Sequence, residues 1–539
     1  MKAEEHVVAA DFVANLLSPE AKAAAVEHLA GCAQCREAVE AAAKTAAEAP
    51  LRPLPPSGPA ALKVLVPRFA ARIWRILNFA GRFGIVIGVT GGVLLLPAPE
   101  GVSPEGHRAL ALLAFTASIL ALEPVALPIG ALMVPLVQVG LGIARAGEAF
   151  EPFSRPVVFL ILSSMFLAEA LRKHGLARRL ALGTLVATGG QVRRVLFGLM
   201  AIAAILSMWV ENTATAAMLI PVALTASRQI EDKAAARSFL VLLVLGIAYS
   251  ASLGGMATVM GSASNAVSAG FLAEIRPWRF MDWMAYGLPA LVLIFPLTWW
   301  LLLRMAPVSI ERLDVERARQ ALHKQGRMSS FEKEILGVVA VAGVLWVGGE
   351  GIEKLGGLSP TLLSASLVGV GAVAYLGIRG IVNWEDVKGV SWGIFLIIGA
   401  GLSLGDALIR TGVTVWLAGL VSPVVGGLPL LVSLTLLVLI SAVLTNLLSN
   451  TTIAAVFVPV LISLAKADPS FSAVQLVLPV ALATTFGYSL PSASGRMALI
   501  AASGIITRSE MLRYGLLMTL ANSAVLVAYF YVLTLLGWI

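Results

Sequence analysis

The sequence predicts an all-α polytopic membrane protein with two inverted repeats. Its 539 residues are 58% hydrophobic and only 13% charged, and the mean hydropathy is +0.89. A soluble protein of this length is far less apolar. The polar triplets Glu211-Asn212-Thr213 and Ser449-Asn450-Thr451 interrupt two apolar segments at corresponding positions. The sequence therefore predicts two related halves, each with a polar interruption at membrane depth.

Residues 1–48 are polar and rich in alanine, and a small helical module is expected there. His28, Cys32 and Cys35 have the spacing of metal ligands, and His6 is the fourth candidate ligand. This part resembles the zinc-binding anti-sigma-factor domain. The resemblance implies a bound zinc ion and a sigma-factor-like or other protein partner. The alternative is two reduced cysteines near unrelated histidines.

Residues 49–82 are expected to be a linker, rich first in proline and then in arginine. Arginines beside a first span favour the cytoplasmic side, so the N-terminus is expected in the cytoplasm. The first residues lack the basic start and apolar core of a signal peptide. With Cys32 and Cys35 as the only cysteines, no disulfide framework is expected.

The membrane domain is expected over residues 83–539. Its first repeat covers about 107–304, a basic cytoplasmic loop covers 305–333, and the second repeat covers about 334–539. Apolar spans are expected at 83–98, 107–123, 125–144, 156–170, 237–256, 284–304, 334–349, 359–378, 392–404 and 512–536.

Each repeat is also expected to contain a re-entrant hairpin and a broken helix. Asn212 and Asn450 are placed at the hairpin tips, because lipid offers no partner to a polar side chain. The stretches 261–265 and 489–496 interrupt helices, which is tolerated where the backbone lines a cavity. An odd number of spans in each half makes the copies inverted, and a site between tips and breaks suits alternating access.

The hairpin tips predict a site for ions. Thr213 or Thr451 is expected to cap the second arm, whose positive end favours an anion. Carbonyls freed at the end of the first arm are expected to hold a cation. The alternative is a pair of polar clamps between helices. The net charge of +8 is assigned to cytoplasmic loops, so no nucleic-acid partner is expected. An enzyme is not expected, because the membrane part shows no spaced nucleophile and base.

Several stretches together resemble the divalent anion/sodium symporter family, over residues 83–539. They are Ser207-Met208-Trp209 through Pro221, Ala248 through Thr258, Gly393-Ile394-Phe395 through Leu408, and Thr445-Asn446 through Pro459. The resemblance implies about eleven spanning helices, two re-entrant hairpins, a homodimer in the lipid bilayer and elevator-type transport of dicarboxylates, citrate or sulfate.

The resemblance also implies roles for individual residues. Substrate residues at the tips are Asn212, Thr213, Ser449, Asn450 and Thr451, and Ser262 and Ser494 face the substrate from the broken helices. A first sodium site involves Ser207, Glu211, Asn212 and Gly261. A second sodium site involves Thr445, Asn450 and Ala493.

The sequence departs from the family pattern within the site itself. Glu211 stands where the first motif usually has serine. Ser262-Ala263-Ser264-Asn265 lacks the usual paired prolines before Asn, and Ser494-Gly495-Arg496-Met497 lacks both the prolines and the Asn. Glu211 strengthens cation binding, exchanges a coupling proton or lies in a watery vestibule without a role. Arg496 has three open interpretations. It forks onto a substrate carboxylate or sulfate, supplies a fixed positive charge where the second sodium would bind, or snorkels to an interface or pairs with Glu211.

The expected function is secondary active transport of divalent anions, with C4-dicarboxylates as the first expectation, across a bacterial inner membrane. The expected coupling ion is sodium, with a proton through Glu211 as the alternative. A carrier of sulfate or another inorganic oxyanion on the same scaffold is the first rival. The second rival is a zinc-dependent, membrane-anchored sensor or anti-sigma-like regulator.

Overall fold

The computed structural model describes residues 68–539 apart from 360, 426 and 469. This described part is helical, and its strand-like pairing is limited to an isolated bridge between Gln191 and Arg312. The predicted zinc ligands His6, His28, Cys32 and Cys35 lie outside the described residues.

The α-helices and short 3-10 turns (η) of the first half are α4 (Arg68–Leu95), α5 (Pro104–Leu122), α6 (Leu127–Gly140), α7 (Ala146–Phe150), η3 (Glu151–Ser154), α8 (Pro156–Lys173), α9 (Leu176–Ala187), α10 (Val192–Ser207), α11 (Asn212–Ser227), α12 (Lys233–Met256), α13 (Ala263–Leu272) and α14 (Phe280–Met305).

The second half begins after a short polar helix, α15. Its helices and turns are α15 (Glu316–Lys324), α16 (Ser330–Gly356), α17 (Ala365–Ile378), α18 (Trp384–Lys388), α19 (Trp392–Arg410), α20 (Val413–Val425), α21 (Leu430–Leu447), α22 (Asn450–Ala467), α23 (Ala473–Ala483), η4 (Thr484–Phe486), η5 (Pro491–Ala493), α24 (Gly495–Ala502) and α25 (Arg508–Leu535).

Long apolar helices confirm the prediction of a polytopic membrane protein. Within the described part, eight helices are long and apolar enough to cross a membrane. The number rises to nine if 146–154 and α8, bent by 46°, count as one span. The helix α11, with 16 residues, is shorter than these, whereas α21 and α22, with 18 residues each, are among the eight. These helices place the described part of the chain in a membrane.

The order of elements from α8 to α14 recurs from α19 to α25. In each series a long helix and a shorter one precede the two arms of a hairpin, α10 with α11 and α21 with α22. An interrupted helix follows, α12 and α13 in the first series and α23 and α24 in the second, and a long helix ends each series. The hairpins and helix breaks thus fall where the polar triplets and the Gly- and Ser-rich stretches predict them.

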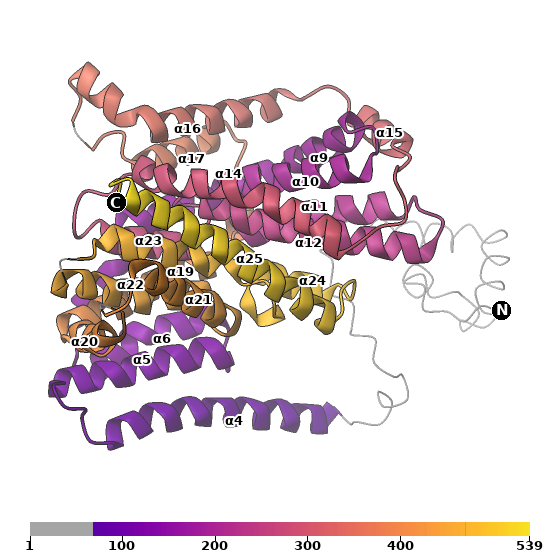
Figure 1. The fold of residues 1–539 in the computed structure, drawn as a ribbon. Coiled ribbons are helices and arrows are strands. Elements are labelled where there is room, and N and C mark those ends of the chain that lie inside the picture. Colours follow the sequence, from indigo (N-terminus) through magenta and orange to yellow (C-terminus); the bar gives the residue numbers. More distant parts are fainter. Residues whose placement is uncertain (1–67, 360, 426, 469) are drawn as a thin grey trace, which may run out of the picture. The chain divides into compact units, whose positions relative to one another are not determined.

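Helix α12 is the most enclosed of the candidate spans. Within it, 94% of an 18-residue window is buried, compared with 22% for α16. It packs against α10, α11 and α14 (Figure 1). The first broken helix therefore lies in the protein interior, where its freed backbone groups find protein partners instead of lipid.

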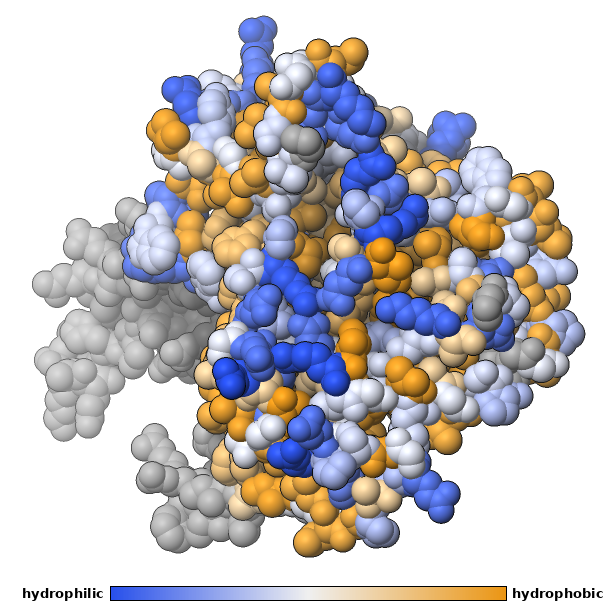
Figure 2. All heavy atoms as spheres, turned by 90° about the vertical axis from the view of Figure 1, so that its left-hand side faces the viewer, coloured by the Kyte–Doolittle hydropathy of each residue, from blue (hydrophilic) through white to orange (hydrophobic). Residues whose placement is uncertain are grey.

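Hydrophobic side chains cover much of the outer surface of the described part. Leu355 is 92% exposed, and Leu136, Val344 and Ile378 are also exposed. Figure 2 looks onto one end of the helices, where hydrophilic side chains gather in the middle and hydrophobic ones reach the edges. Exposed apolar side chains on long helices are what a lipid environment requires.

A buried ion pair ties α9 to the start of α16. Arg179 Nε donates to Glu332 Oε1 at 2.7 Å, and its Nη1 donates to the Gly326 carbonyl at 2.8 Å. The Glu332 carboxylate also accepts from the Ser329 N–H at 2.6 Å, which closes a capping box. The side chains are only 15% and 7% exposed, so each charge depends on the other.

The Glu332→Ala variant is expected to lose about 3–5 kcal/mol of stability, because it leaves the Arg179 charge buried without its partner. Thermal unfolding of the purified protein in detergent measures the loss. The control is Glu316→Ala, whose partner Arg319 is 53% exposed, and its effect should stay within about 1 kcal/mol. Equal losses of stability in the two variants would show that the buried pair stabilises the protein no more than the exposed pair does.

Candidate functional site

The first hairpin turns between α10 and α11, and Glu211 caps the second arm. Its carboxylate accepts hydrogen bonds from the backbone N–H groups of Thr213 (2.8 Å) and Ala214 (3.2 Å) and from the Thr213 hydroxyl (3.0 Å). These N–H groups have no partner within the helix, and the helix end is positive. The expectation that Thr213 caps this arm is wrong, because Thr213 lies inside the helix and itself needs a capping partner.

The second hairpin turns between α21 and α22 and is capped by Ser449. The Ser449 hydroxyl accepts from the Thr452 N–H at 3.2 Å and lies 3.1 Å from the Thr452 hydroxyl. Thr451 is buried within the first turn of α22, so the expectation that it caps the arm is also wrong. The two tips therefore share a capping position but differ in charge there.

Each tip asparagine is held by a hydroxyl five residues earlier, at the end of the first arm. Ser207 Oγ lies 2.6 Å from the Asn212 amide. Thr445 Oγ1 donates to Asn450 Oδ1 at 2.5 Å. The sequence predicted both pairs as parts of cation sites, and the structure brings each pair together at the same place in its hairpin.

The Asn212 amide also faces two main-chain carbonyls. The amide atom nearest to Ser207 lies 3.0 Å from the Ala251 carbonyl oxygen and 2.9 Å from that of Gly261. The contacts of this atom identify it as the nitrogen, which donates to both carbonyl oxygens and to Ser207 Oγ. Three oxygens, the ligand type of a hard cation, thus surround the Asn212 amide. A Cβ at Gly261 would lie 2.7 Å from the Ser207 carbonyl oxygen, so this close approach requires glycine.

The break between α12 and α13 is closed by Asn265. Its amide nitrogen donates to the carbonyls of Gly255 and Thr258, both at 2.8 Å. The Thr258 hydroxyl in turn donates to the Met208 carbonyl at the end of the first hairpin arm (2.5 Å). Side-chain donors thus satisfy carbonyls that the helix break leaves free.

The break between α23 and α24 contains Arg496, which is only 1% exposed. Its Nη2 donates to the Thr485 carbonyl at 3.0 Å and approaches the Gly487 carbonyl at 3.4 Å. The interpretation that Arg496 snorkels to an interface is wrong, because the side chain is buried. Within the described residues, Arg496 forms no ion pair with Glu211. The Glu211 carboxylate is instead engaged at the cap of α11.

Carbonyl oxygens from the end of α21 and from the second break lie close to Gly487. A Cβ added at Gly487 would lie 3.2 Å from the Thr445 carbonyl oxygen and 3.3 Å from that of Ala493. The Thr445 hydroxyl also lies 2.7 Å from the Thr484 carbonyl oxygen. The residues predicted for the second sodium site thus lie in one oxygen-rich region, beside the Arg496 guanidinium.

Hydroxyl groups join the two broken helices directly. Ser262 Oγ lies 2.9 Å from Ser264 Oγ, and Thr484 Oγ1 lies 2.9 Å from Ser264 Oγ. The Ser252 hydroxyl donates to the Thr485 carbonyl. The bonds of Ser264 with Thr484 and of Ser252 with Thr485 link residues 220 and 233 positions apart in the sequence, so the two halves share one polar centre.

Helices α11, α13, α22 and α24 all begin around this centre, and Thr213 on α11 lies against Gly495 on α24. Ser262 and Ser494 stand at the N-cap positions of α13 and α24, but their side chains do not cap them. Within the described part, Ser494 Oγ and Arg496 Nε are buried without a hydrogen-bond partner. Unmet donors beside positive helix ends suit an anion.

Most predicted site residues therefore lie around one centre, and the structure adds others to them. The added residues are Ala251, Ser264, Asn265 and Thr484. Ser264 and Asn265 belong to the predicted helix break, so the sequence pattern could have identified them as site residues. Ala251 contributes only a main-chain carbonyl, and Thr484 lies in an apolar run, so neither has a sequence signal.

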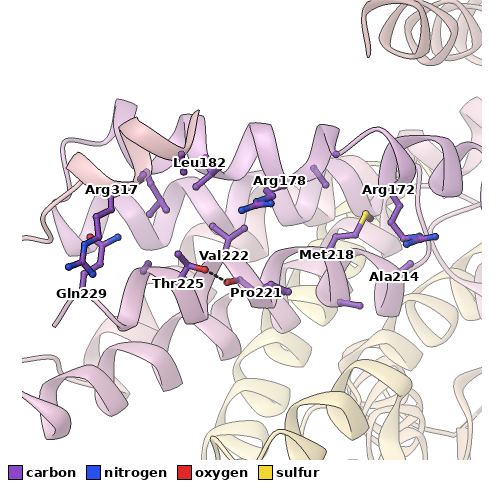
Figure 3. A pocket seen from close by; sticks show the side chains of 17 residues that line it. Arg172, Arg178, Leu182, Ala214, Met218, Pro221, Val222, Thr225, Gln229 and Arg317 are labelled. Carbon is purple, nitrogen blue, oxygen red and sulfur yellow. Dashed lines mark hydrogen bonds between the residues drawn. The ribbon is translucent and has the colours of Figure 1, made fainter. Parts of the chain in front are cut away.

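A groove of about 690 Å³ runs along α11, between α9 and α15. Ala214, next to the hairpin tip, lies at one end near Arg172, and Gln229 lies at the other end near Arg317 (Figure 3). Arg178 stands between them. Arg178 and Arg317 have no carboxylate partner in the part of the chain that the structure describes, whereas Arg172 pairs with Glu169. The groove thus combines apolar walls with positive charge.

Paired hairpins and broken helices that share a polar centre define a membrane transporter of the secondary type. The chain belongs to the family described as the sodium:sulfate symporter transmembrane region, whose model matches residues 78–539. This match confirms the resemblance found in the sequence.

Known relatives agree with this assignment. The chain is 31% identical over 423 residues to an uncharacterized transporter of Haemophilus influenzae, covering 77% of this chain and 89% of the relative. It is 28% identical over 490 residues to the sodium-dependent dicarboxylate transporter SdcS of Staphylococcus saprophyticus, covering 85% and 93%. The solved structure of the Alcanivorax borkumensis YdaH transporter has a similar fold, with a TM-score of 0.51 and 14% identity over 86% of this chain and 98% of that one.

The cap of α11 predicts different outcomes for two substitutions of Glu211. Glu211→Ala removes the acceptor for the Thr213 and Ala214 N–H groups and is expected to cost about 1 kcal/mol of stability. Glu211→Ser keeps a capping oxygen, as Ser449 does in the second hairpin, and should cost clearly less. Thermal unfolding in detergent compares the two variants. If serine destabilises as much as alanine, capping is not what Glu211 contributes.

Proposed function

We propose that this chain is a secondary active transporter that couples the movement of a C4-dicarboxylate to sodium. The observation that carries the proposal is the convergence of oxygens from Ser207, Ala251 and Gly261 on the Asn212 amide at the first hairpin tip. Hydroxyl, amide and carbonyl oxygens are the ligands that a small hard cation prefers. The Glu211 carboxylate is engaged by the N–H groups of α11, which leaves these neutral oxygens to hold the cation.

The anion is assigned to the space next to this cation site, where helices begin. There the positive ends of α11 and α24 meet, and Ser494 Oγ and Arg496 Nε offer donors without a protein partner. A dianion replaces the hydrogen bonds that these buried groups lack. The substrate residues proposed are Asn212, Thr213, Ser262, Ser449, Asn450, Thr451, Ser494 and Arg496.

The choice of a dicarboxylate is supported by the relatives named sodium-dependent dicarboxylate transporters. The family description names sulfate, which is also a dianion, and sulfate is therefore the competing substrate in the test. Both anions suit the same donors, but a C4-dicarboxylate has two separate carboxylates, each of which accepts from its own donors.

We assign the groove along α11 as a route for the anion. It ends at Ala214, the residue that follows Thr213 at the tip, and three arginines line it. A groove with low-dielectric walls and positive charge attracts anions over several ångströms and raises their local concentration.

Uptake of labelled succinate into proteoliposomes tests the proposed function. An inward sodium gradient is expected to drive uptake, and an inward proton gradient without sodium is not. Asn212→Ala and Asn450→Ala should each lower uptake about tenfold or more, since a lost ligand costs about 1–3 kcal/mol. The control is Asn383→Ala, whose side chain only caps the short helix α18 and whose uptake should stay near wild type.

Competition by malate and by sulfate then identifies the substrate class. Strong competition by malate and weak competition by sulfate agree with the proposal. Sodium-driven uptake of sulfate without succinate uptake would assign the inorganic anion instead. Uptake of neither anion under any gradient would contradict the proposed function.

The groove assignment predicts an effect that depends on ionic strength. Arg178→Gln and Arg317→Gln should raise the KM for succinate several-fold at low salt while kcat stays near wild type, because attraction along the route weakens. High salt should remove the difference. Arg319→Gln is the matched control, since Arg319 is also on α15 but pairs with Glu316 outside the groove. Unchanged KM values at low salt would exclude this route.

A further inference from the structure

Arg496 is a fully buried cation that forms no direct ion pair among the described residues, although the Glu211 carboxylate acts on it from a longer distance. It lies in the broken helix of the second half and is 1% exposed. An unpaired charge at such a place costs several kcal/mol unless polar groups replace its water. Arginine stays protonated in proteins, so it does not escape this cost by losing its proton. Some feature of the surroundings must therefore hold the charge.

Main-chain carbonyl groups hold the positive charge of Arg496. The Arg496 Nη2 donates to the Thr485 carbonyl at 3.0 Å and approaches the Gly487 carbonyl at 3.4 Å. Both residues follow the end of α23, where the helix stops and its last carbonyls have no helical partner. The carbonyl end of a helix is negative, and freed carbonyls of this kind can coordinate a metal cation. The guanidinium thus occupies surroundings that suit a bound ion.

The corresponding helix break in the first half contains no arginine. There the helix-break carbonyls of Gly255 and Thr258 accept from the neutral amide of Asn265. The oxygens of Ser207, Ala251 and Gly261 surround the neutral Asn212 amide, while the adjacent Glu211 carboxylate caps α11. The first half therefore keeps a neutral oxygen cluster, whereas the second half has a cation built into the chain.

The rest of the second site retains the features of an ion site. Thr445 Oγ1 contacts Asn450 Oδ1 at 2.5 Å, as Ser207 contacts Asn212 in the first half. The carbonyl oxygens of Thr445 and Ala493 both lie close to Gly487. This site in the second half combines the oxygens of an ion site with an adjacent arginine. Its positive charge is therefore supplied permanently.

We propose that the Arg496 guanidinium is a tethered cation that replaces a second coupling ion, so that the protein binds one sodium ion, in the first half. This inference rests on the proposed function, because it specifies the number of ions in the same site. One sodium ion and one arginine then supply two positive charges opposite the dianion, while the Glu211 carboxylate faces the N–H groups at the start of α11. Nη2 is committed to the carbonyls, and Nε remains directed to the substrate.

Thermal unfolding at increasing sodium tests the inference without requiring transport. Ionic strength is kept constant with choline. Above the dissociation constant, the slope of stability against the logarithm of sodium concentration reports the number of bound ions. Wild type should give the slope of one ion. Arg496→Met removes the charge but fills similar space, and its slope should double as sodium enters the vacated site. Arg496→Lys keeps the charge and should retain the wild-type slope.

The controls separate the site from general effects of charge. Arg508→Met removes an exposed arginine at the start of α25 and should leave the slope unchanged. An Arg496→Met protein that folds only in sodium also supports the inference. A slope of two ions in wild type, an unchanged slope in Arg496→Met, or an Arg496→Met protein that sodium does not stabilise would each overturn it. If wild type moves neither succinate nor sulfate yet the slope doubles, the transport proposal fails and the ion replacement stands.

Discussion

The structure depends on one constraint, which is that lipid offers no hydrogen-bond partners to the backbone. Helices that end at membrane depth must therefore satisfy their free N–H and carbonyl groups inside the protein. Here those ends are collected around one centre. N-terminal ends of α11, α13, α22 and α24 supply positive potential, and the ends of α10, α12, α21 and α23 supply carbonyls. A place for an anion beside a place for a cation follows from this arrangement.

The two halves use the same framework with different charges. Ser207 with Asn212 and Thr445 with Asn450 form matching contacts at the two tips. The caps differ, since an acidic side chain closes α11 and a serine closes α22. The side chains at the helix breaks also differ in charge. Asn265 in the first half is neutral, whereas Arg496 in the second half is positive. The first half thus has an added negative charge and the second an added positive one, although their geometry corresponds.

Apolar patterning located most of the fold. It placed the hairpin tips at Asn212 and Asn450, where α11 and α22 begin, and it located both helix breaks. It set the first span at 83–98, whereas α4 covers Arg68–Leu95, because a hydropathy pattern does not register a helix that continues through basic residues. It also assigned the caps to the wrong residues. The direction of Arg496 and the contact of Ser264 with Thr484, 220 positions apart, depend on tertiary packing. Local sequence does not encode such contacts.

The most direct measurement is a density map of the protein in lipid nanodiscs with saturating sodium and succinate. The account predicts density for one cation between Ser207, Asn212 and Gly261, and density for the dianion beside Thr213 and Ser494. It predicts guanidinium density in place of an ion at the carbonyls of Thr485 and Gly487. A second cation at those carbonyls, with Arg496 turned away, would contradict the account. So would succinate bound elsewhere while the polar centre stays free of it.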